Sequence, residues 1–417
     1  MTGDLDREAL QELLQDRRLR MLLEALNGDG EETRLVGGAV RNALLGRRVK
    51  DRDCATTATP EVTIRRAEAA GYKAVPTGIE HGTITVVVEG EPFEVTTLRE
   101  DVETDGRRAV VRFGRDFATD ARRRDFTINA LSVSPDGRLH DYAGGLQDLA
   151  ARRVRFIGDA HTRIREDYLR ILRFFRFHAE YGDGELDAAG FDAAVRERAG
   201  LAGLSHERIR TELLRLVAAP RAVETVERLA DCGLLALLLG GVAELGRFAR
   251  VVAFEGARPD PVRRLAALGV MTRDDADRLR ERLRLSNEEH RRIEAYGAMV
   301  ELLKTRTLPV DGAAMRPLVA EHGVEPLADT LRALAGEPRP DVRTDALAAL
   351  HRFEVGEEPV PVFPLRGRDL IAGGVEKGPR VGELMAAARR AWLAQGCPSD
   401  ETSIRALLHR TLDLHRL

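Results

Sequence analysis

Strand-forming segments are confined to the first part of this 417-residue chain, and this asymmetry constrains the fold more than any other feature. Short extended runs at Arg34–Val36, Thr83–Val88, Phe93–Leu98 and Ile128–Val133 alternate with helical patterns over about the first 155 residues. From about Asp159 onward, apolar residues recur almost only with helical spacing. The sequence therefore predicts an α+β sheet domain followed by helices alone.

Helical periodicity also predicts an N-terminal amphipathic helix over about residues 1–30 and a short helix from Ala39 to Leu45. The proline-rich stretch 356–364 is typical of a linker that leads to a final helical pair. In the second part of the chain, helices are expected over Ile164–Ala179, Glu207–Ala218, Ala222–Leu239, Arg278–Leu303, Pro326–Ala335 and Val381–Ala394.

Composition excludes several classes of protein. The longest apolar runs, such as Leu234–Leu239, are far shorter than the roughly 20 residues that cross a bilayer, so no membrane association is expected. The acidic N-terminus and three separated cysteines without a Cys-x-x-Cys pair favour a cytoplasmic protein without disulfides. Net charge is −3, yet residues 121–176 contain 12 Arg and no Lys against 7 acids. Such a local excess can attract a polyanion, although a general bias toward Arg contributes to it.

The first cluster with chemical content surrounds a Gly-Gly turn. Gly37 and Gly38 separate a strand from a helix, where backbone N–H groups can approach a phosphate, and Arg41 lies one turn further on. Asp51 and Asp53 are two residues apart, so on an extended strand their carboxylates share a face, with Cα atoms about 7 Å apart. Such a pair suits Mg²⁺ with water and substrate phosphates. Solvated acids at a strand end are the alternative.

Glu94 adds a third carboxylate to this set. It lies between Phe93 and Val95 in an extended run, so its side chain faces away from both apolar neighbours. A Gly-Gly turn, an Asp-x-Asp pair and a later acid on a strand are the groups expected for two-metal nucleotidyl transfer, in which metal ions activate a hydroxyl and stabilise the leaving pyrophosphate.

Arg124 and Asp125 belong to a second cluster, Arg-Arg-Asp-Phe-Thr-Ile-Asn-Ala. One interpretation is a surface ion pair at the entry to a strand, which contributes little free energy. In the other, Arg124 contacts a phosphate or ribose, and Asp125 with Asn129 fixes its position.

The third cluster lies on a predicted helix that carries Asp167, Arg170, Arg173 and Arg176. On one helix Asp167 and Arg170 are neighbours, whereas Arg176 has turned about 180° from Asp167. Glu166 lies four residues before Arg170 and can hold it. An acceptor beside a donor matches the edges of cytosine and adenine, and guanine and uracil present the reverse order. The alternative is an ion pair on a solvated helix.

Together these motifs resemble the class II tRNA nucleotidyltransferase and bacterial poly(A) polymerase family, within the polymerase β-like nucleotidyltransferases. The resemblance rests on LVGGAVRNALLGRRVKDRDCAT, FEVTTLR, RRDFTINA and REDYLRILRFFRF, and is strong over residues 33–180. It implies a nucleotidyltransferase head (1–157), then a helical neck with the base-reading helix (158–235), a helical body (236–310) and a helical tail that binds tRNA (311–417).

The resemblance also implies site residues and substrates. Asp51 and Asp53 would bind Mg²⁺ and, with Glu94, form the catalytic set. The nucleotide would be contacted by Gly37, Gly38, Arg41, Arg124, Asp167, Arg170, Arg173 and Arg176, with Asp167 and Arg170 reading the base. The expected activity is template-independent addition of CCA to the tRNA 3′ end and acceptor arm from CTP and ATP. The alternatives are a poly(A) polymerase, an enzyme that adds only CC or only A, and a noncatalytic RNA-binding protein.

Two further features bear on this resemblance. Asn42 stands where the family usually has an aspartate, and we expect it to tune the nucleotide site rather than remove a metal ligand. The segment Glu100–Asp120 resembles the full-length flexible loop of CCA-adding members, which favours complete CCA addition. The sequence indicates no oligomeric state.

Overall fold

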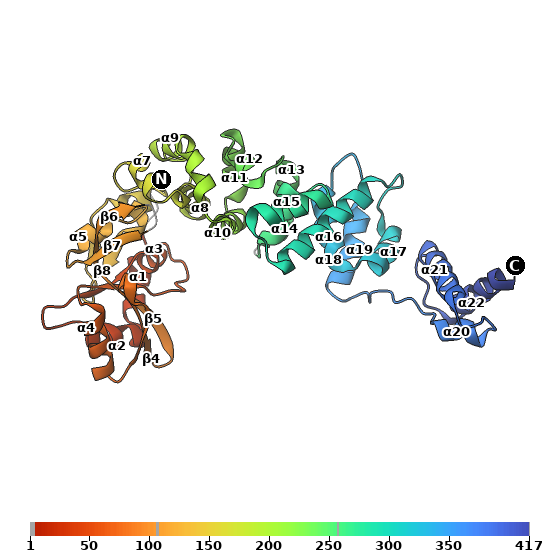
Figure 1. Ribbon diagram of the computed structural model, residues 1–417, viewed down its shortest axis with the longest axis horizontal. Coiled ribbons are helices and arrows are strands. Elements are labelled where there is room, and N and C mark those ends of the chain that lie inside the picture. The colour runs from red at the N-terminus through yellow and green to blue at the C-terminus, as the bar shows by residue number, and fades with distance from the viewer. Residues whose placement is uncertain (1–4, 106–107, 257, 417) are drawn as a thin grey trace. The chain divides into compact units, whose positions relative to one another are not determined.

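The computed structural model describes residues 5–105, 108–256 and 258–416, and their side chains apart from 100–111 and 414–416. The chain forms two compact units, an N-terminal unit, Met1–Thr225, and a C-terminal unit, Val226–Leu417. Among the described residues every strand lies in the N-terminal unit, in the red-to-yellow part of the chain in Figure 1. The predicted order of a sheet domain followed by helices is confirmed. The finer division into head, neck, body and tail stays a prediction.

The elements of the N-terminal unit alternate between helices and short strands. In chain order they are α1 (Arg7–Leu14), α2 (Arg17–Leu26), β1 (Thr33–Val36), α3 (Gly38–Leu44), β2 (Cys54–Thr56), α4 (Pro60–Ala69), β3 (Lys73–Gly78), β4 (Thr83–Val88), β5 (Glu91–Thr97), β6 (Arg99–Asp105), β7 (Arg108–Phe113), α5 (Phe117–Arg122), β8 (Leu131–Val133), β9 (Leu139–Asp141), α6 (Gly145–Ala150), α7 (Ala160–Glu166), α8 (Leu169–Tyr181), α9 (Ala188–Arg196) and α10 (His206–Ala218). Short 3₁₀ turns are η1 (Ile79–His81), η2 (Thr127–Asn129) and η3 (Arg198–Gly203).

A seven-stranded sheet with the order β3-β4-β5-β2-β1-β8-β9 forms the centre of this unit. Only β2 and β5 pair in parallel, and β4 and β5 form the predicted hairpin. Sequence patterns miss β2, which has only three residues, and the two edge strands β3 and β9. β6 and β7 pair separately, in the segment where a flexible loop was expected; residues 106 and 107 between them lie outside the described residues.

One face of the sheet is covered by helices, and the other is open to a pocket. Ile84, Val86 and Val88 of β4 are buried while the residues between them are half-buried, and α2 and α4 pack against these strands. This alternation is the period-2 pattern of a sheet that buries one face. The opposite face therefore carries the polar side chains of Glu94 and Thr96, which line the pocket described below.

Several helices predicted as continuous are broken by residues that cap a new helix. The N-terminal helix divides into α1 and α2 because the Asp16 side chain accepts a hydrogen bond from the Leu19 N–H at 3.0 Å, as an N-cap residue does. The expected helix from Ile164 to Ala179 divides at Asp167, whose backbone is extended (φ −157°, ψ 105°). The expected strand from Ile128 shortens to β8, because η2 occupies its first residues.

In the C-terminal unit the described residues form helices joined by loops (Figure 1). Gly233 with φ 76° and Arg284 with φ 51° divide two segments that were predicted as single helices. Residues 356–366 form no helix or strand, which confirms the linker. The elements, beginning with the helix that crosses the boundary between the units, are α11 (Ala222–Asp231), α12 (Leu234–Leu239), α13 (Leu245–Glu255), α14 (Pro261–Gly269), α15 (Arg273–Leu283), α16 (Asn287–Lys304), α17 (Gly312–His322), α18 (Val324–Leu334), α19 (Thr344–Glu354), α20 (Gly367–Ala372), α21 (Pro379–Ala394) and α22 (Glu401–Arg416).

Candidate active site

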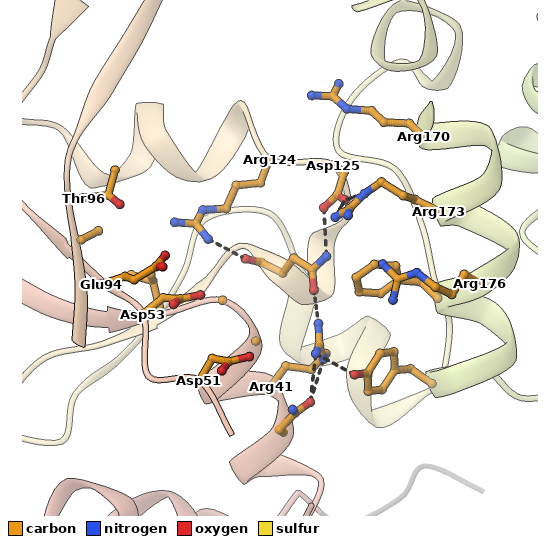
Figure 2. Close-up of a pocket in the computed structure, with 18 of the residues that line it drawn as sticks. Arg41, Asp51, Asp53, Glu94, Thr96, Arg124, Asp125, Arg170, Arg173 and Arg176 are labelled. Carbon is orange, nitrogen blue, oxygen red and sulfur yellow. Dashed lines mark hydrogen bonds and ion pairs between the residues drawn. The ribbon is translucent and has the colours of Figure 1, made fainter. Parts of the chain in front are cut away.

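A pocket of about 1000 Å³ lies within the N-terminal unit, between the open face of the sheet and helix α8. Its lining holds eleven basic side chains against seven acidic ones, so it favours an anionic ligand. Figure 2 shows Asp51, Asp53 and Glu94 on the side of the strands and the arginines of α8 on the opposite side. The pocket is lined by every predicted site residue: Gly37, Gly38, Arg41, Asp51, Asp53, Glu94, Arg124, Asp167, Arg170, Arg173 and Arg176.

The first glycine of the Gly-Gly turn leaves no room for a side chain. Gly37 lies between β1 and α3 with φ 64° and ψ −119°, a conformation that L side chains rarely adopt. A Cβ atom there would lie 2.9 Å from Nη1 of Arg124. Glycine at this position therefore allows both the turn into α3 and the close approach of an arginine to the turn.

The three predicted catalytic carboxylates meet because β2 and β5 pair in parallel. Asp51 and Asp53 immediately precede β2, and the register Cys54↔Val95 places Glu94 beside Asp53. Phe93 and Val95 are buried and Glu94 is exposed, so Glu94 faces away from its apolar neighbours as expected. Figure 2 shows all three carboxylates directed toward the centre of the pocket.

These carboxylates repel one another. Burial, the charge of Glu94 and the charge of Asp51 raise the pKa of Asp53. Within the described part of the chain, no ion pair neutralises Asp51, Asp53 or Glu94, and no three His, Cys, Asp or Glu side chains form a preformed metal cluster. Two oxygen-donor carboxylates that leave coordination positions for water and phosphate suit a hard divalent ion such as Mg²⁺.

Arg124 is held by Asp120 rather than by Asp125, which corrects one expectation. Its Nη2 lies 3.2 Å from Oδ2 of Asp120, and Nη1 donates to the Asn129 carbonyl at 3.3 Å. Burial of Asp120 opposes its ionisation, but Arg124 and Arg123 hold its pKa below the usual range. Arg124 is thus fixed beside Gly37.

Asp125 instead connects α8 to the Gly-Gly turn. Its Oδ2 accepts from Nε of Arg173 at 2.8 Å, and its Oδ1 accepts from Nδ2 of Asn129 at 2.9 Å. The other end of the Asn129 amide accepts from Arg41. Although Asp125 is buried, Arg173 holds its pKa below the usual range, so the carboxylate stays ionised at neutral pH.

Arg41 is a buried cation whose acceptors are all neutral. Its side chain, 6% exposed, donates to the side-chain oxygens of Asn42, Asn129 and Tyr181. Its guanidinium also lies 4.0 Å from the centre of the Tyr181 ring. Burial lowers the pKa of Arg41. Because these acceptors are neutral, the positive charge of Arg41 is not cancelled at its nearest hydrogen-bond partners.

Asp167 and Arg170 are not neighbours on one helix, because α7 ends before Asp167 and α8 begins after Tyr168. Asp167 uses Oδ1 to accept from the Leu169 N–H at 3.1 Å, and Oδ2 accepts from Arg208 at 2.7 Å. Arg170 pairs through Nη1 with Glu166, as expected. The break follows from the tendency of Asp to bond nearby backbone N–H groups.

The side chains of Arg173 and Arg176 form ion pairs with carboxylates. Arg173 pairs with Asp125, and Arg176 pairs with Glu212 of α10 and with Glu180. The Arg176 side chain is only 7% exposed, so it lies at the base of the pocket. This placement agrees with the helix geometry, which turns Arg176 away from Asp167.

Sequence reasoning missed several residues that hold these groups: Asp120, Tyr181, Arg208 and Glu212. In α10, Arg208, Glu212 and Arg215 recur at intervals of four and three residues, so they share one polar helix face. That spacing was the feature of the sequence that could have indicated these residues of α10. It gave no indication that the face packs on α8.

Comparison with known proteins agrees with this site. Residues 33–155 match the family described as the poly A polymerase head domain, and residues 191–245 match the probable RNA and SrmB-binding site of polymerase A. The mouse mitochondrial CCA tRNA nucleotidyltransferase 1 is 35% identical over 407 residues, covering 94% of this chain and 90% of the mouse protein. The CCA-adding enzyme of Leuconostoc citreum is 40% identical over 225 residues, covering 53% of this chain and 54% of that enzyme.

A solved structure extends the similarity to the fold. The crystal structure of the Bacillus stearothermophilus CCA-adding enzyme in complex with CTP has a TM-score of 0.73 and 28% identity, covering 98% of this chain and 99% of that one. The chain belongs to the family of CCA-adding tRNA nucleotidyltransferases and poly(A) polymerases. Enzymes of this family generally use divalent metal ions. None of the described helices is long and apolar enough to cross a membrane.

Proposed function

We propose that this enzyme adds C, C and A in turn to the 3′ end of tRNA, using CTP and ATP and releasing pyrophosphate. One observation carries the proposal. A single pocket holds three carboxylates that form no ion pair with any described residue, a Gly-Gly turn with a fixed arginine, and Asp167 and Arg170 at the start of α8. These are the groups needed to activate a hydroxyl, bind a triphosphate and select a base without a template.

In the reaction, the 3′-hydroxyl oxygen of the RNA bonds to the α-phosphorus of the nucleotide, and the bond from that phosphorus to the pyrophosphate oxygen breaks. The Gly37–Gly38 backbone and Arg124 are placed to hold the phosphates, since the turn lies at the N-terminus of α3 and next to a guanidinium. Arg41 adds a charge that its neutral acceptors leave uncancelled.

Asp51 and Asp53 would hold Mg²⁺, and Glu94 would add a third negative charge beside them. When bound there, the metal would lower the pKa of the RNA hydroxyl and offset charge on the leaving pyrophosphate. The raised pKa of Asp53 has the sign expected for a site that favours a cation, because a positive charge between the carboxylates relieves their repulsion.

Base selection would come from Asp167 and Arg170. Each carboxylate oxygen of Asp167 can accept more than one hydrogen bond, so an amino group of cytosine or adenine can bind beside Arg208 and the Leu169 N–H. Glu166 and the Arg163 carbonyl engage only Nη1 of Arg170, which leaves Nε and Nη2 to donate to a ring nitrogen. Arg173 and Arg176 support this helix face.

We place the enzyme in the cytoplasm. Its three cysteines are free, and burial raises the pKa of Cys54 to about 12, so this thiol stays protonated. Both features suit a reducing compartment.

The test is to incubate the enzyme with Mg²⁺, CTP, ATP and a tRNA that lacks its 3′ CCA, and to size the product at single-nucleotide resolution. We expect three added residues, a stop at that length, and a requirement for both nucleotides. A stop after two residues would mean CC addition, and one A added only to a tRNA ending in CC would mean A addition. A long ladder with ATP alone would mean a poly(A) polymerase, and no Mg²⁺-dependent incorporation would indicate a noncatalytic protein.

A further inference from the structure

Nine of the eleven basic side chains of the pocket fall into two groups according to what they contact. Six arginines pair with carboxylates and are thereby fixed: Arg123, Arg124, Arg170, Arg173, Arg176 and Arg208. Arg48, Lys50 and Arg215 also line the pocket, but they form no hydrogen bond or ion pair with any residue that the structure describes. All three side chains are exposed. Their charge is therefore available to a ligand.

These three cations lie toward the C-terminal end of α8. Along α10, Arg208 contacts Asp167 just before α8, Glu212 contacts Arg176 further along it, and Arg215 continues in that direction by one helical turn. The loop that carries Arg48 and Lys50 is tied to the same end. There Arg47 donates to the Glu180 carbonyl at 2.9 Å and lies 4.9 Å from the centre of the Tyr181 ring.

The groups proposed to read the base lie at the other end of α8, at Asp167 and Arg170. A helix of 13 residues is about 20 Å long. The cations at its C-terminal end are therefore too far from the base-reading groups to bind the same base. Lys50 is also next to Asp51 in the chain, so this end adjoins the carboxylates where the RNA hydroxyl must arrive.

We propose that Arg48, Lys50 and Arg215 bind the phosphodiester backbone of the acceptor RNA at its single-stranded 3′ end. The inference rests on the proposed function, because it takes the acceptor to be an RNA. Exposed, unpaired cations bind phosphates without first breaking an internal ion pair, and such contacts dominate affinity for a nucleic acid backbone. Of the fixed arginines, Arg124 and Arg170 contact the incoming nucleotide, whereas the free cations contact the growing RNA strand.

The experiment compares Arg48→Gln, Lys50→Gln and Arg215→Gln with two matched controls, Arg65→Gln and Lys73→Gln. Arg65 and Lys73 are exposed residues of the same unit and lie outside the pocket lining. Binding of labelled tRNA without CCA is measured by fluorescence anisotropy at several salt concentrations, with no nucleotide present. A second tRNA lacks its entire single-stranded 3′ end.

Each pocket variant should weaken binding of the first tRNA by about 3- to 10-fold at low salt and make the logarithmic salt slope shallower by about 0.7. The controls should change neither quantity. The second tRNA should bind the variants and the unmodified enzyme equally. The KM values for CTP and ATP should stay within about twofold while the KM for tRNA rises.

An equal loss for both tRNAs would overturn the inference, because the cations would then contact another part of the RNA. A rise in the KM for CTP or ATP with unchanged tRNA binding would assign them to the triphosphate instead. Failure of the unmodified enzyme to extend any tRNA would refute the proposed function itself, and this outcome is distinct from the other two.

Discussion

The two sides of the pocket differ in whether their charged side chains form ion pairs. On the sheet side, Asp51, Asp53 and Glu94 lie close together without an ion pair to any described residue, and the pKa of Asp53 is raised. On the helix side, four arginines are each paired: Arg170 with Glu166, Arg173 with Asp125, Arg176 with Glu212, and Arg208 with Asp167.

This contrast indicates that the two sides of the pocket have different functions. A cation that arrives from solution is attracted by carboxylates that form no ion pair with any described residue, whereas base selection requires donors and acceptors held in one geometry. Carboxylates on the sheet side should therefore lower stability and support the transfer step. Carboxylates on the helix side should stabilise the fold or base selection without being needed for the transfer step. Substitutions on each side of the pocket test this difference.

The largest effect is expected from Asp51→Asn. The amide keeps the shape but removes the charge proposed to hold the metal, so kcat should fall by at least about 10³-fold, or roughly 4 kcal/mol. Single-turnover addition of one C to tRNA measures this step. Glu68→Gln, at an exposed acid on α4, serves as the control and should retain the normal rate. Near-normal transfer by Asp51→Asn would mean that the metal assignment is wrong.

Glu212→Gln should have the largest effect on stability. The Arg176 and Glu212 side chains are only 7% and 6% exposed, and removing one partner leaves a buried charge incompletely paired. We expect a loss of about 3 kcal/mol in the free energy of unfolding, measured by denaturant titration. The comparison variant is Asp192→Asn, which breaks the exposed pair with Arg196 and should cost less than about 1 kcal/mol. Equal losses in both variants would contradict the expectation that the buried ion pair contributes more to stability than the exposed one.

Asp167→Ala should reduce selection of C and A over G and U by about 10- to 100-fold, because the acceptor for the amino group is lost. Competition between nucleotides in primer extension gives this ratio. Since Asp167 also bonds the Leu169 N–H, Asp167→Asn provides a variant that can keep this contact while offering a donor to the base. Unchanged selectivity in both variants would contradict the assignment of Asp167 to base reading.

The smallest effect is a gain in stability from Asp53→Asn, measured by thermal unfolding without divalent ions. The folded state raises the pKa of Asp53, so ionisation costs stability at pH values above that pKa and costs nothing below the unfolded value of about 3.9. Near neutral pH, the free energy of unfolding of the variant should therefore exceed that of the unmodified enzyme by less than about 1 kcal/mol, because solvent screens the repulsion. The difference should disappear as the pH falls below about 4. A loss of stability at neutral pH would contradict the repulsion.

The features that the sequence predicted correctly depend on local geometry. The positions of Gly37, Gly38 and Glu94 follow from a turn conformation and from strand alternation, both of which are set by neighbouring residues. The break at Asp167 was missed because helical periodicity of the apolar residues continues across it, while the Asp side chain accepts a hydrogen bond from the backbone N–H of Leu169, two residues further on.

Contacts between distant segments could not be predicted. Asp125 is separated from Arg173 by 48 residues, and Arg176 from Glu212 by 36, so each pair depends on how α8 packs in the folded protein. The parallel pairing of β2 with β5 is also a tertiary event, and it alone places Glu94 beside Asp53. Motif content therefore identified which residues gather at the pocket, while their partners required the structure.

The most direct measurement sizes the products made by the unmodified enzyme, Asp51→Asn and Asp167→Ala from one tRNA that lacks CCA, with all four nucleotides present. We predict three residues of CCA for the unmodified enzyme, no extension for Asp51→Asn, and extension with incorporated G or U for Asp167→Ala. A normal CCA product from Asp51→Asn, or a complete loss of extension from Asp167→Ala in a folded protein, would contradict the division of tasks between the two sides of the pocket.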